Sequence, residues 1–338
     1  VFAWLGLPKN HAGKVPGIVL VQGGGGTAFK EWVKKWNEHG FAAISVAVEG
    51  QTDRREPTEP RNKSNPLGWM RSPWPGPARA GIYGDSSEPL TNQWMYHAVV
   101  DTVLANSLLR SLPEVDADKV GLMGISWGGV IASTVIGIDT RFDFAIPTYG
   151  CGHLYDDPNI YGKALGHSQL YREVWDPMVW LNRARMPVFW FTDLSDQHFA
   201  LDCQADCYRA ASGSHMVAIV PGMKHGHQPA WNPPESYAFA ESIVCQSRPW
   251  CRQTSATVEQ RVARVVFAAT KPLAGATLIS TSDTGFTGDR KWKESPATLK
   301  KNGAEWHITT PLPAGTTAWF INVRSGNLVA SSDFQEIK

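Results

Sequence analysis

A serine inside a glycine-rich turn is the first pattern in this sequence that can do chemistry. Ser126 lies in Gly124-Ile125-Ser126-Trp127-Gly128-Gly129. Apolar residues before this stretch predict a buried strand, and the residues after it predict a helix. A Gly-x-Ser-x-Gly turn between a strand and a helix leaves almost no room for flanking side chains and presents the serine at the head of a sheet. We therefore expect Ser126 to be a nucleophile; an ordinary glycine-rich loop is the alternative.

A serine hydroxyl needs a base to take its proton, and a carboxylate must orient that base. In this type of architecture the chain order is serine, acid, histidine, with each residue just after a strand. Asp196 and His225 satisfy that order after two predicted strands. Asp193 and His227 are the competing acid and base. We prefer Asp196 and His225, and expect the other two to cap helices or to form supporting hydrogen bonds.

A second glycine run, Gly23-Gly24-Gly25-Gly26, follows the predicted strand 15–21 and precedes a predicted helix over 29–38. Such a run lets backbone amides point at a bound oxygen. A phosphate loop is disfavoured because the Gly-Lys-Ser/Thr ending is missing; a flexible turn remains an alternative. We predict an oxyanion hole built from the Trp127 amide and one amide of the glycine run. Gln22 and Trp231 are candidate substrate-binding residues.

The order of elements predicts the fold class. Strands and helices alternate through residues 1–250, which predicts an α/β domain whose mainly parallel sheet is covered on both faces. Two irregular stretches, about 49–91 and 150–186, interrupt the alternation. We expect the first to be a functional loop, with a solvated excursion packed by its own prolines as the alternative, and the second to be a lid. Residues 255–338 contain short strands between Gly, Pro and Asn turns, which predicts a small β-sandwich domain.

Composition excludes several classes of function. The 338 residues carry a net charge of +1, which gives no electrostatic basis for binding nucleic acid or an anionic membrane. No apolar run approaches the roughly 20 residues that span a bilayer. We expect no cofactor and no metal. A zinc site needs four converging ligands, and no second Cys-x-x-Cys-type pair is present to supply them. The pairs Cys203/Cys207 and Cys245/Cys251 are spaced to close small loops in an oxidising compartment.

Two further features bear on location and ligand. The chain opens with Val1, within a predicted strand, so we expect that an upstream segment was removed and that the protein is secreted or periplasmic. Fifteen tryptophans is a high number. Most should pack in the core or the lid, but exposed aromatic faces also stack on sugar rings, which mildly favours a carbohydrate-related ligand.

Three stretches together resemble a known family. Residues 19–29, 124–129 and 221–227 are similar to those of the α/β-hydrolase superfamily, within it the dienelactone hydrolase-like and acetyl xylan esterase-like bacterial serine esterases. The resemblance covers about residues 1–245. It implies Ser126 as nucleophile, Asp196 as acid and His225 as base. These relatives usually carry histidine where this chain has Gln22.

The sequence thus predicts a metal-free serine carboxylesterase that forms an acyl-enzyme. The resemblance and the aromatic residues favour short acyl groups, above all acetyl, on a sugar or small alcohol. One alternative is a serine peptidase of the prolyl-oligopeptidase type, although nothing here predicts the propeller that usually precedes such a domain. The other is a non-catalytic carbohydrate-binding protein, which has no need of an ordered serine, aspartate and histidine.

Overall fold

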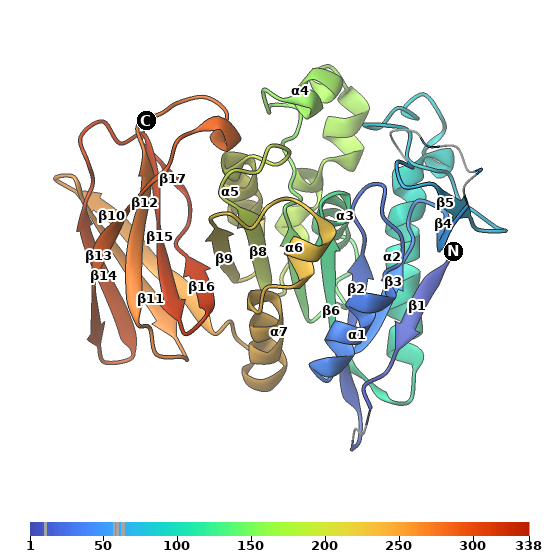
Figure 1. Ribbon diagram of the computed structural model, residues 1–338, viewed down its shortest axis with the longest axis horizontal. Helices are drawn as coiled ribbons and strands as arrows, with labels where there is room; N and C mark the ends of the chain where they lie inside the picture. Colours follow the sequence, from blue (N-terminus) through green and yellow to red (C-terminus); the bar gives the residue numbers. More distant parts are fainter. Residues whose placement is uncertain (10–11, 57, 59–60, 62–64, 338) are drawn as a thin grey trace.

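The computed structural model describes residues 1–9, 12–56, 58, 61 and 65–337. A long mixed sheet runs through the whole molecule (Figure 1). Its central strands are parallel, and the antiparallel β1 (Ala3–Gly6) lies beside β3. In spatial order these parallel strands are β3 (Ala42–Val46), β2 (Val15–Val21), β6 (Val115–Ile125), β7 (Phe144–Thr148), β8 (Val188–Asp193) and β9 (His215–Val220). The predicted strands 15–21 and 215–220 have these same bounds.

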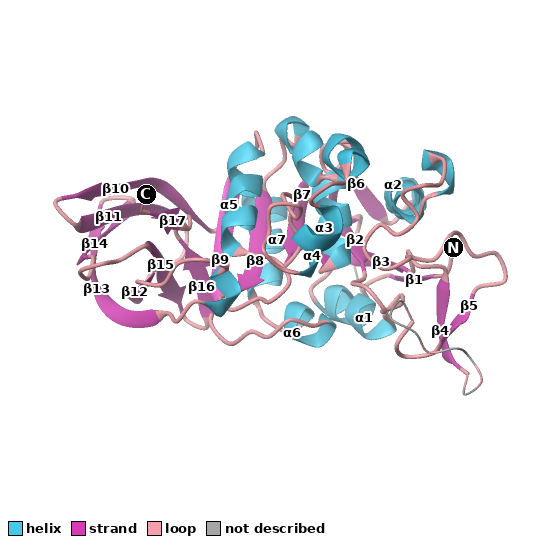
Figure 2. Ribbon diagram, turned by 90° about the horizontal axis from the view of Figure 1, so that it is seen from above, coloured by secondary structure: helices cyan, strands magenta, loops and turns pink. Residues whose placement is uncertain are grey.

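Helices cover both faces of this sheet, as predicted. Figure 2 shows α1 (Lys30–Glu38) and α6 (His227–Trp231) on one side, and α2 (Trp94–Ser111) and α5 (Leu201–Ala210) on the other. α7 (Glu235–Gln246) packs on α1, with the rings of Trp36 and Tyr237 4.6 Å apart. α3 (Trp127–Val135) packs on α2 and on the parallel strands β6 and β7.

Both irregular stretches contain short elements. The first forms the hairpin of β4 (Gln51–Arg55) and β5 (Trp69–Arg71) and the helical turn Leu90–Asn92; residues 57, 59, 60 and 62–64 of this stretch lie outside the described residues. The second stretch, 150–186, contains α4 (Ile160–Leu165) and the helical turns Tyr171–Trp175, Pro177–Val179 and Leu181–Arg183.

Residues 251–336 form an antiparallel assembly that we call the β-unit (orange and red in Figure 1). The first half of its strand β13 pairs with β12 and the second half with β14, so this strand passes from one sheet to the other. The strands are β10 (Cys251–Glu259), β11 (Val262–Ala269), β12 (Gly275–Thr281), β13 (Lys293–Asn302), β14 (Glu305–Pro311), β15 (Ala318–Ser325), β16 (Leu328–Ser331) and β17 (Gln335–Glu336), with the helical turn Thr287–Asp289 after β12.

A buried polar seam joins the β-unit to the central sheet. β16 runs antiparallel to β9, with Ser331 opposite Val217. The Ile219 amide donates to Ser331 Oγ (2.8 Å), Ser331 Oγ donates to Asn322 Oδ1 (2.5 Å), and Asn322 Nδ2 donates back to the Ile219 carbonyl (2.9 Å). All these groups are buried, so each depends on the others for its hydrogen bonds. The β-unit therefore continues the central sheet.

The order in which successive strands join the central sheet reverses between β2 and β6, although the strands themselves stay parallel. β2 leads to β3 on one side, whereas β6 leads to β7, β8 and β9 on the other. Such a switch point leaves a crevice at the carboxyl ends of the strands, where ligands bind in open α/β sheets. Both glycine turns of the sequence lie at this crevice, because one follows β2 and the other follows β6.

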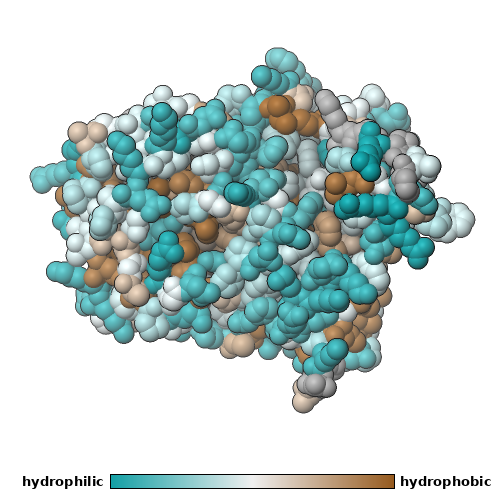
Figure 3. Space-filling view, viewed as in Figure 1, coloured by the Kyte–Doolittle hydropathy of each residue, from teal (hydrophilic) through white to brown (hydrophobic). Residues whose placement is uncertain are grey.

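The described residues contain no membrane-spanning helix and no disulfide bond. The face in Figure 3 is largely hydrophilic, with hydrophobic residues in small separate groups. No helix of the described part is long and apolar enough to cross a bilayer. All five cysteines are free, so the pairings that their spacing suggested are not formed. Cys203 and Cys207 lie on α5, and burial raises the pKa of both thiols.

The seam leads to a stability prediction. Ser331→Ala removes the acceptor of the buried Ile219 amide and the donor to Asn322, so we expect the free energy of unfolding to fall by about 1–3 kcal/mol. Urea unfolding followed by circular dichroism measures this loss. The control is Ser325→Ala at the end of β15, which should change stability by less than about 0.5 kcal/mol. Equal effects of the two variants would contradict the role of the seam.

Candidate active site

The turn after β6 holds Ser126 in a backbone conformation that L-residues rarely adopt, with φ 58° and ψ −119°. Glycines on both sides make the turn possible. A Cβ at Gly124 would lie 1.9 Å from the Gly128 carbonyl oxygen, and a Cβ at Gly128 would lie 2.1 Å from the Val21 carbonyl oxygen. α3 therefore begins against the end of β2, and Ser126 sits at its N-terminus, where the helix dipole favours negative charge.

The structure brings Ser126, His225 and Asp196 together. Ser126 Oγ lies 2.9 Å from His225 Nε2, and His225 Nδ1 lies 2.7 Å from Asp196 Oδ2. The second carboxylate oxygen, Oδ1, accepts the backbone amides of His198 (2.7 Å) and Phe199 (2.9 Å). Asp196 is buried, so its carboxylate is held by hydrogen bonds on both sides. This arrangement can move a proton from the serine to the imidazole and stabilise the resulting cation.

Asp193, the competing acid, has a supporting position. Its two carboxylate oxygens accept the amides of Ser195 and Met223, each at 3.2 Å. It thereby connects the loop that carries Asp196 to the loop that carries His225. Tyr149 also supports the histidine loop, because its hydroxyl donates to the Lys224 carbonyl (2.7 Å).

The glycine run lies beside Ser126, and three of its four amides are occupied. The Gly23 amide donates to His227 Nε2 (3.0 Å), the Gly25 amide to Glu49 Oε2 (3.1 Å), and the Gly26 amide to the Gly23 carbonyl (3.1 Å). The Gly24 amide has no hydrogen-bond partner among the described residues. Gly24 is also next to the elbow, since a Cβ there would meet the Trp127 ring at 2.6 Å.

A buried ion pair between Glu49 and Arg79 holds the glycine run through the Gly25 amide. Glu49 Oε1 accepts from Arg79 Nε at 2.7 Å, while the other oxygen holds the Gly25 amide. Burial raises the pKa of Glu49, and the neighbouring Arg79 opposes that rise. Arg79 lies over the Trp127 ring, with its guanidinium carbon 5.2 Å from the ring centroid. Loop 49–91 therefore contacts both the glycine run and the Trp127 side chain.

Aromatic residues of both irregular stretches and of α2 pack around the Trp127 side chain. The rings of Tyr83, Trp94 and Tyr161 pack edge-on against it at 5.6–5.8 Å. Tyr161, from the predicted lid, is itself buried. The lid aromatics thus contribute to packing that orients the elbow, and most of them do not present a face to a ligand.

Gln22 and Trp231 have packing positions instead of the predicted substrate contacts. Gln22 is fully buried, and neither atom of its amide has a hydrogen-bond partner. Trp231 is 5% exposed and stacks on Trp32, with ring centroids 5.5 Å apart. Neither side chain offers a surface to a substrate in this structure, so we assign both to the support of the glycine run and of α1.

His227, the competing base, has a supporting position, with its ring nitrogen bonded to the glycine run. Burial, with a smaller contribution from the nearby His225, lowers the pKa of His227 to about 4. A neutral ring has a free lone pair, and that lone pair accepts the Gly23 amide. His227 therefore fixes the glycine run without adding a charge beside His225. The sequence favoured a supporting hydrogen bond for His227 but did not identify the Gly23 amide as its partner.

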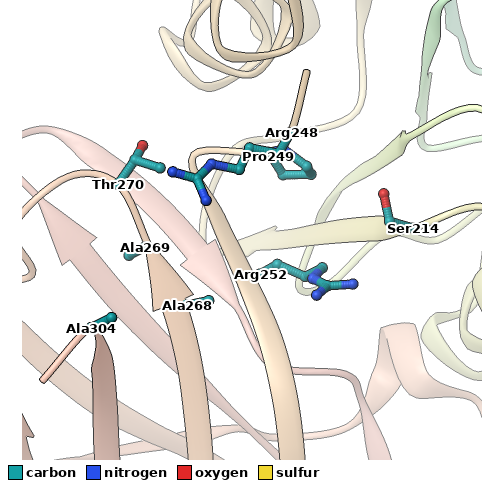
Figure 4. Close-up of a pocket in the computed structure, with 8 residues that line it drawn as sticks. All are labelled: Ser214, Arg248, Pro249, Arg252, Ala268, Ala269, Thr270 and Ala304. Carbon is teal, nitrogen blue, oxygen red and sulfur yellow. The ribbon is translucent and has the colours of Figure 1, made fainter. Parts of the chain in front are cut away.

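A separate pocket lies away from this site. A pocket of about 380 Å³ lies between the central sheet and the β-unit, where Arg248 extends toward Thr270 and Arg252 toward Ser214 (Figure 4). Ser214 directly precedes β9 whereas His225 follows it, so this pocket is at the opposite end of the strands from Ser126. No cluster of three potential metal-ligating side chains occurs in the described part of the chain.

Comparison with protein families gives one match, which covers slightly more than half of the chain. The family model described as acetyl xylan esterase (AXE1) matches residues 1–176. This segment contains the glycine run and Ser126 and ends before Asp196 and His225. A comparison with curated proteins gives no match.

Solved structures share the α/β-hydrolase fold with this chain. The acetyl xylan esterase of Paenibacillus sp. R4 superposes with a TM-score of 0.55 at 19% identity, over 71% of this chain and 78% of that one. Acetyl xylan esterase 1 of Thermoanaerobacterium sp. JW/SL YS485 gives 0.51 at 19% identity, over 67% and 74%. The acylaminoacyl peptidase of Pyrococcus horikoshii gives 0.51 at 17% identity, over 72% of this chain and 39% of that one.

The depressed pKa of His227 predicts a pH-dependent stability. An unfolded histidine has a pKa of about 6.5. Because the folded value is lower, the unfolded state binds more protons between these pKa values, and stability falls as the pH drops through this window. We expect His227→Gln, which keeps an acceptor for the Gly23 amide, to lose about 2 kcal/mol less than the wild type between pH 7.5 and 5.

Urea unfolding at the two pH values measures this difference. The exposed His167→Gln is the matched control and should retain the wild-type dependence. A wild-type loss no larger than that of His227→Gln would show that His227 is not held neutral in the folded protein.

Proposed function

Because the chain belongs to the acetyl xylan esterase family AXE1 and is a serine ester hydrolase with the α/β-hydrolase fold, we propose that it removes acetyl groups from carbohydrate esters with Ser126 as nucleophile. The observation that carries this proposal is the continuous chain of short contacts from Ser126 Oγ through His225 to Asp196.

The proposed reaction begins with attack of Ser126 Oγ on the ester carbonyl. His225 Nε2 takes the hydroxyl proton, and its cation is stabilised by Asp196. The carbonyl oxygen becomes an oxyanion, which accepts the amides of Trp127 and Gly24. Gly24 is preferred over Gly23 and Gly25 because the other two amides already have partners. One such donor contributes about 3 kcal/mol to transition-state stabilisation.

Collapse of this intermediate breaks the bond to the leaving alcohol. His225 gives its proton to the alcohol oxygen, which leaves an acetyl-enzyme on Ser126. Water then attacks the acetyl carbonyl while His225 takes a proton from it, and a second collapse returns that proton to Ser126 Oγ. Acetate and the free sugar hydroxyl are the products, and the enzyme is restored.

A carbohydrate substrate gains support from one exposed aromatic residue. Trp74 is 86% exposed, between Pro73 and Pro75, which limit the motion of its backbone. Its loop is tied to the site at both ends, because Arg71 donates to the Glu49 carbonyl and Arg79 pairs with the Glu49 carboxylate. A flat, preorganised indole on such a loop can stack on a sugar ring of a bound polysaccharide.

The first test is esterase activity of the wild type and of Ser126→Ala on p-nitrophenyl acetate, butyrate and octanoate. We expect rapid acetate release that declines with chain length, and a fall of kcat by roughly 10⁶-fold in the variant, because no other group can form the acyl-enzyme. An unchanged melting temperature shows that the variant is folded. Faster cleavage of chromogenic dipeptide amides than of acetate would favour a peptidase instead.

Trp74→Ala tests the carbohydrate substrate. We expect KM on acetylated xylan to rise roughly five- to tenfold, the equivalent of about 1–1.4 kcal/mol of lost stacking, while kcat and KM on p-nitrophenyl acetate stay unchanged. Released acetate is the readout for the polymer. The control is Leu67→Ala, which removes another exposed side chain of the same stretch. A polymer KM unaffected by Trp74→Ala would argue against this platform.

A further inference from the structure

We propose that the β-unit is part of the catalytic apparatus, because its residues Thr287 and Gly288 position the loop that carries Asp196. Both lie in the helical turn Thr287–Asp289, between β12 and β13. They are positioning residues, since they contact the Asp196 loop and not the reacting atoms. This inference rests on the proposed function, in which Asp196 orients His225.

Gly288 contacts the Asp196 loop through its backbone. Its carbonyl accepts from Gln197 Nε2 at 2.7 Å. A Cβ at position 288 would lie 2.4 Å from the Asp196 carbonyl oxygen, far closer than real side chains approach a backbone atom. The two loops are therefore in direct contact, and no side chain fits between them at this point.

Thr287 contacts the other end of the same loop. The residue before α5, Ala200, has no side chain that can cap the helix. Thr287 Oγ1 accepts the Leu201 amide at 2.8 Å and so provides that cap from the β-unit. Thr287 is buried, so water cannot replace this acceptor.

The contacts at Gln197 and Leu201 lie on either side of the segment whose amides hold the Asp196 carboxylate. Asp196 Oδ1 accepts the amides of His198 and Phe199, which lie between the two points held by the β-unit, Gln197 and Leu201. A shift of this segment would therefore change the hydrogen bonds on one carboxylate oxygen and turn the other away from His225.

The turn itself is held firmly within the β-unit. The Lys291 amide donates to Asp283 Oδ2 at 2.7 Å, and Arg290 donates through Nε and Nη2 to the Gly285 carbonyl. Arg290 also pairs with Glu336 of β17 at 2.7 Å. A braced turn resists displacement, so it can hold the Asp196 loop instead of following it.

Four variants test this proposal. Gly288→Val places bulk against the Asp196 carbonyl, and Gly275→Val is its control, because a Cβ at position 275 meets no atom within 4 Å. Thr287→Val removes the helix cap with little change in volume, and Thr287→Ser keeps it. The two threonine variants retain a test even where Gly288→Val does not fold.

We expect Gly288→Val and Thr287→Val to lower kcat for p-nitrophenyl acetate at least tenfold, whereas Gly275→Val and Thr287→Ser stay within about twofold of the wild type. A carboxylate beside a histidine raises the pKa of its cation. A displaced Asp196 therefore moves the acid limb of the kcat/KM profile to lower pH. Loss of stability alone would lower the melting temperature without this movement.

A second readout does not depend on turnover. The proton on His225 Nδ1, hydrogen-bonded to Asp196, gives a strongly downfield proton NMR signal. We expect this signal in the wild type, Gly275→Val and Thr287→Ser, and its loss or displacement in Gly288→Val and Thr287→Val. An unchanged signal and pH profile in the latter two variants would overturn the positioning role. An inert wild type with the expected signals would overturn the proposed esterase function while supporting the positioning.

Discussion

The close approach of α3 to the end of β2 is the constraint on which the site depends. At Gly128 the helix backbone comes so near the Val21 and Gln22 carbonyls that no Cβ fits. This approach fixes the strained conformation of Ser126 and brings the Trp127 amide beside the glycine run. The energy stored in one strained residue is of order 1–3 kcal/mol, and the buried strands on either side of the turn offset it. Ser126, the proposed nucleophile, is thus presented by the packing of the central sheet.

Two groups of different chemical character hold the glycine run beside this turn. The oxyanion side is held by charge and a neutral ring, since Glu49 pairs with Arg79 and His227 accepts the Gly23 amide. Breaking a buried ion pair by removing one partner typically costs 3–5 kcal/mol, so this support is rigid. Because the occupied amides belong to Gly23 and Gly25, the support also selects Gly24 as the donor that remains available to an oxyanion.

The sequence predicted those parts of the site that depend on local chain geometry. A tight turn after a strand has a clear glycine pattern, which indicated Ser126 as a candidate, and chain order indicated Asp196 and His225. Contacts between segments remote in sequence have no such pattern. The ion pair between Glu49 and Arg79 spans 30 residues of irregular chain.

How well a strand could be predicted depended on how many of its faces are buried. The central strands appear as apolar runs, because both of their faces are buried, and their bounds were predicted closely. The amphipathic strands β10 and β13 lack such apolar runs, because most of their residues are exposed or only partly buried. Gln22 and Trp231 were assigned to substrate binding from residue type alone, and burial decides such a question only in three dimensions.

The match to the acetyl xylan esterase family ends at residue 176, before both Asp196 and His225. The matched part contains the strained elbow, the glycine run and the ion pair, and therefore the groups to which we assign attack and oxyanion stabilisation. The remaining part contains the proposed acid and base, and the turn at Thr287 contacts the loop of the proposed acid. A triad tolerates different supports for its acid as long as the carboxylate meets the imidazole in the same geometry. In this chain that geometry depends on the polar seam between β9 and β16, because the seam fixes the β-unit, and with it the turn, against the sheet that carries His225.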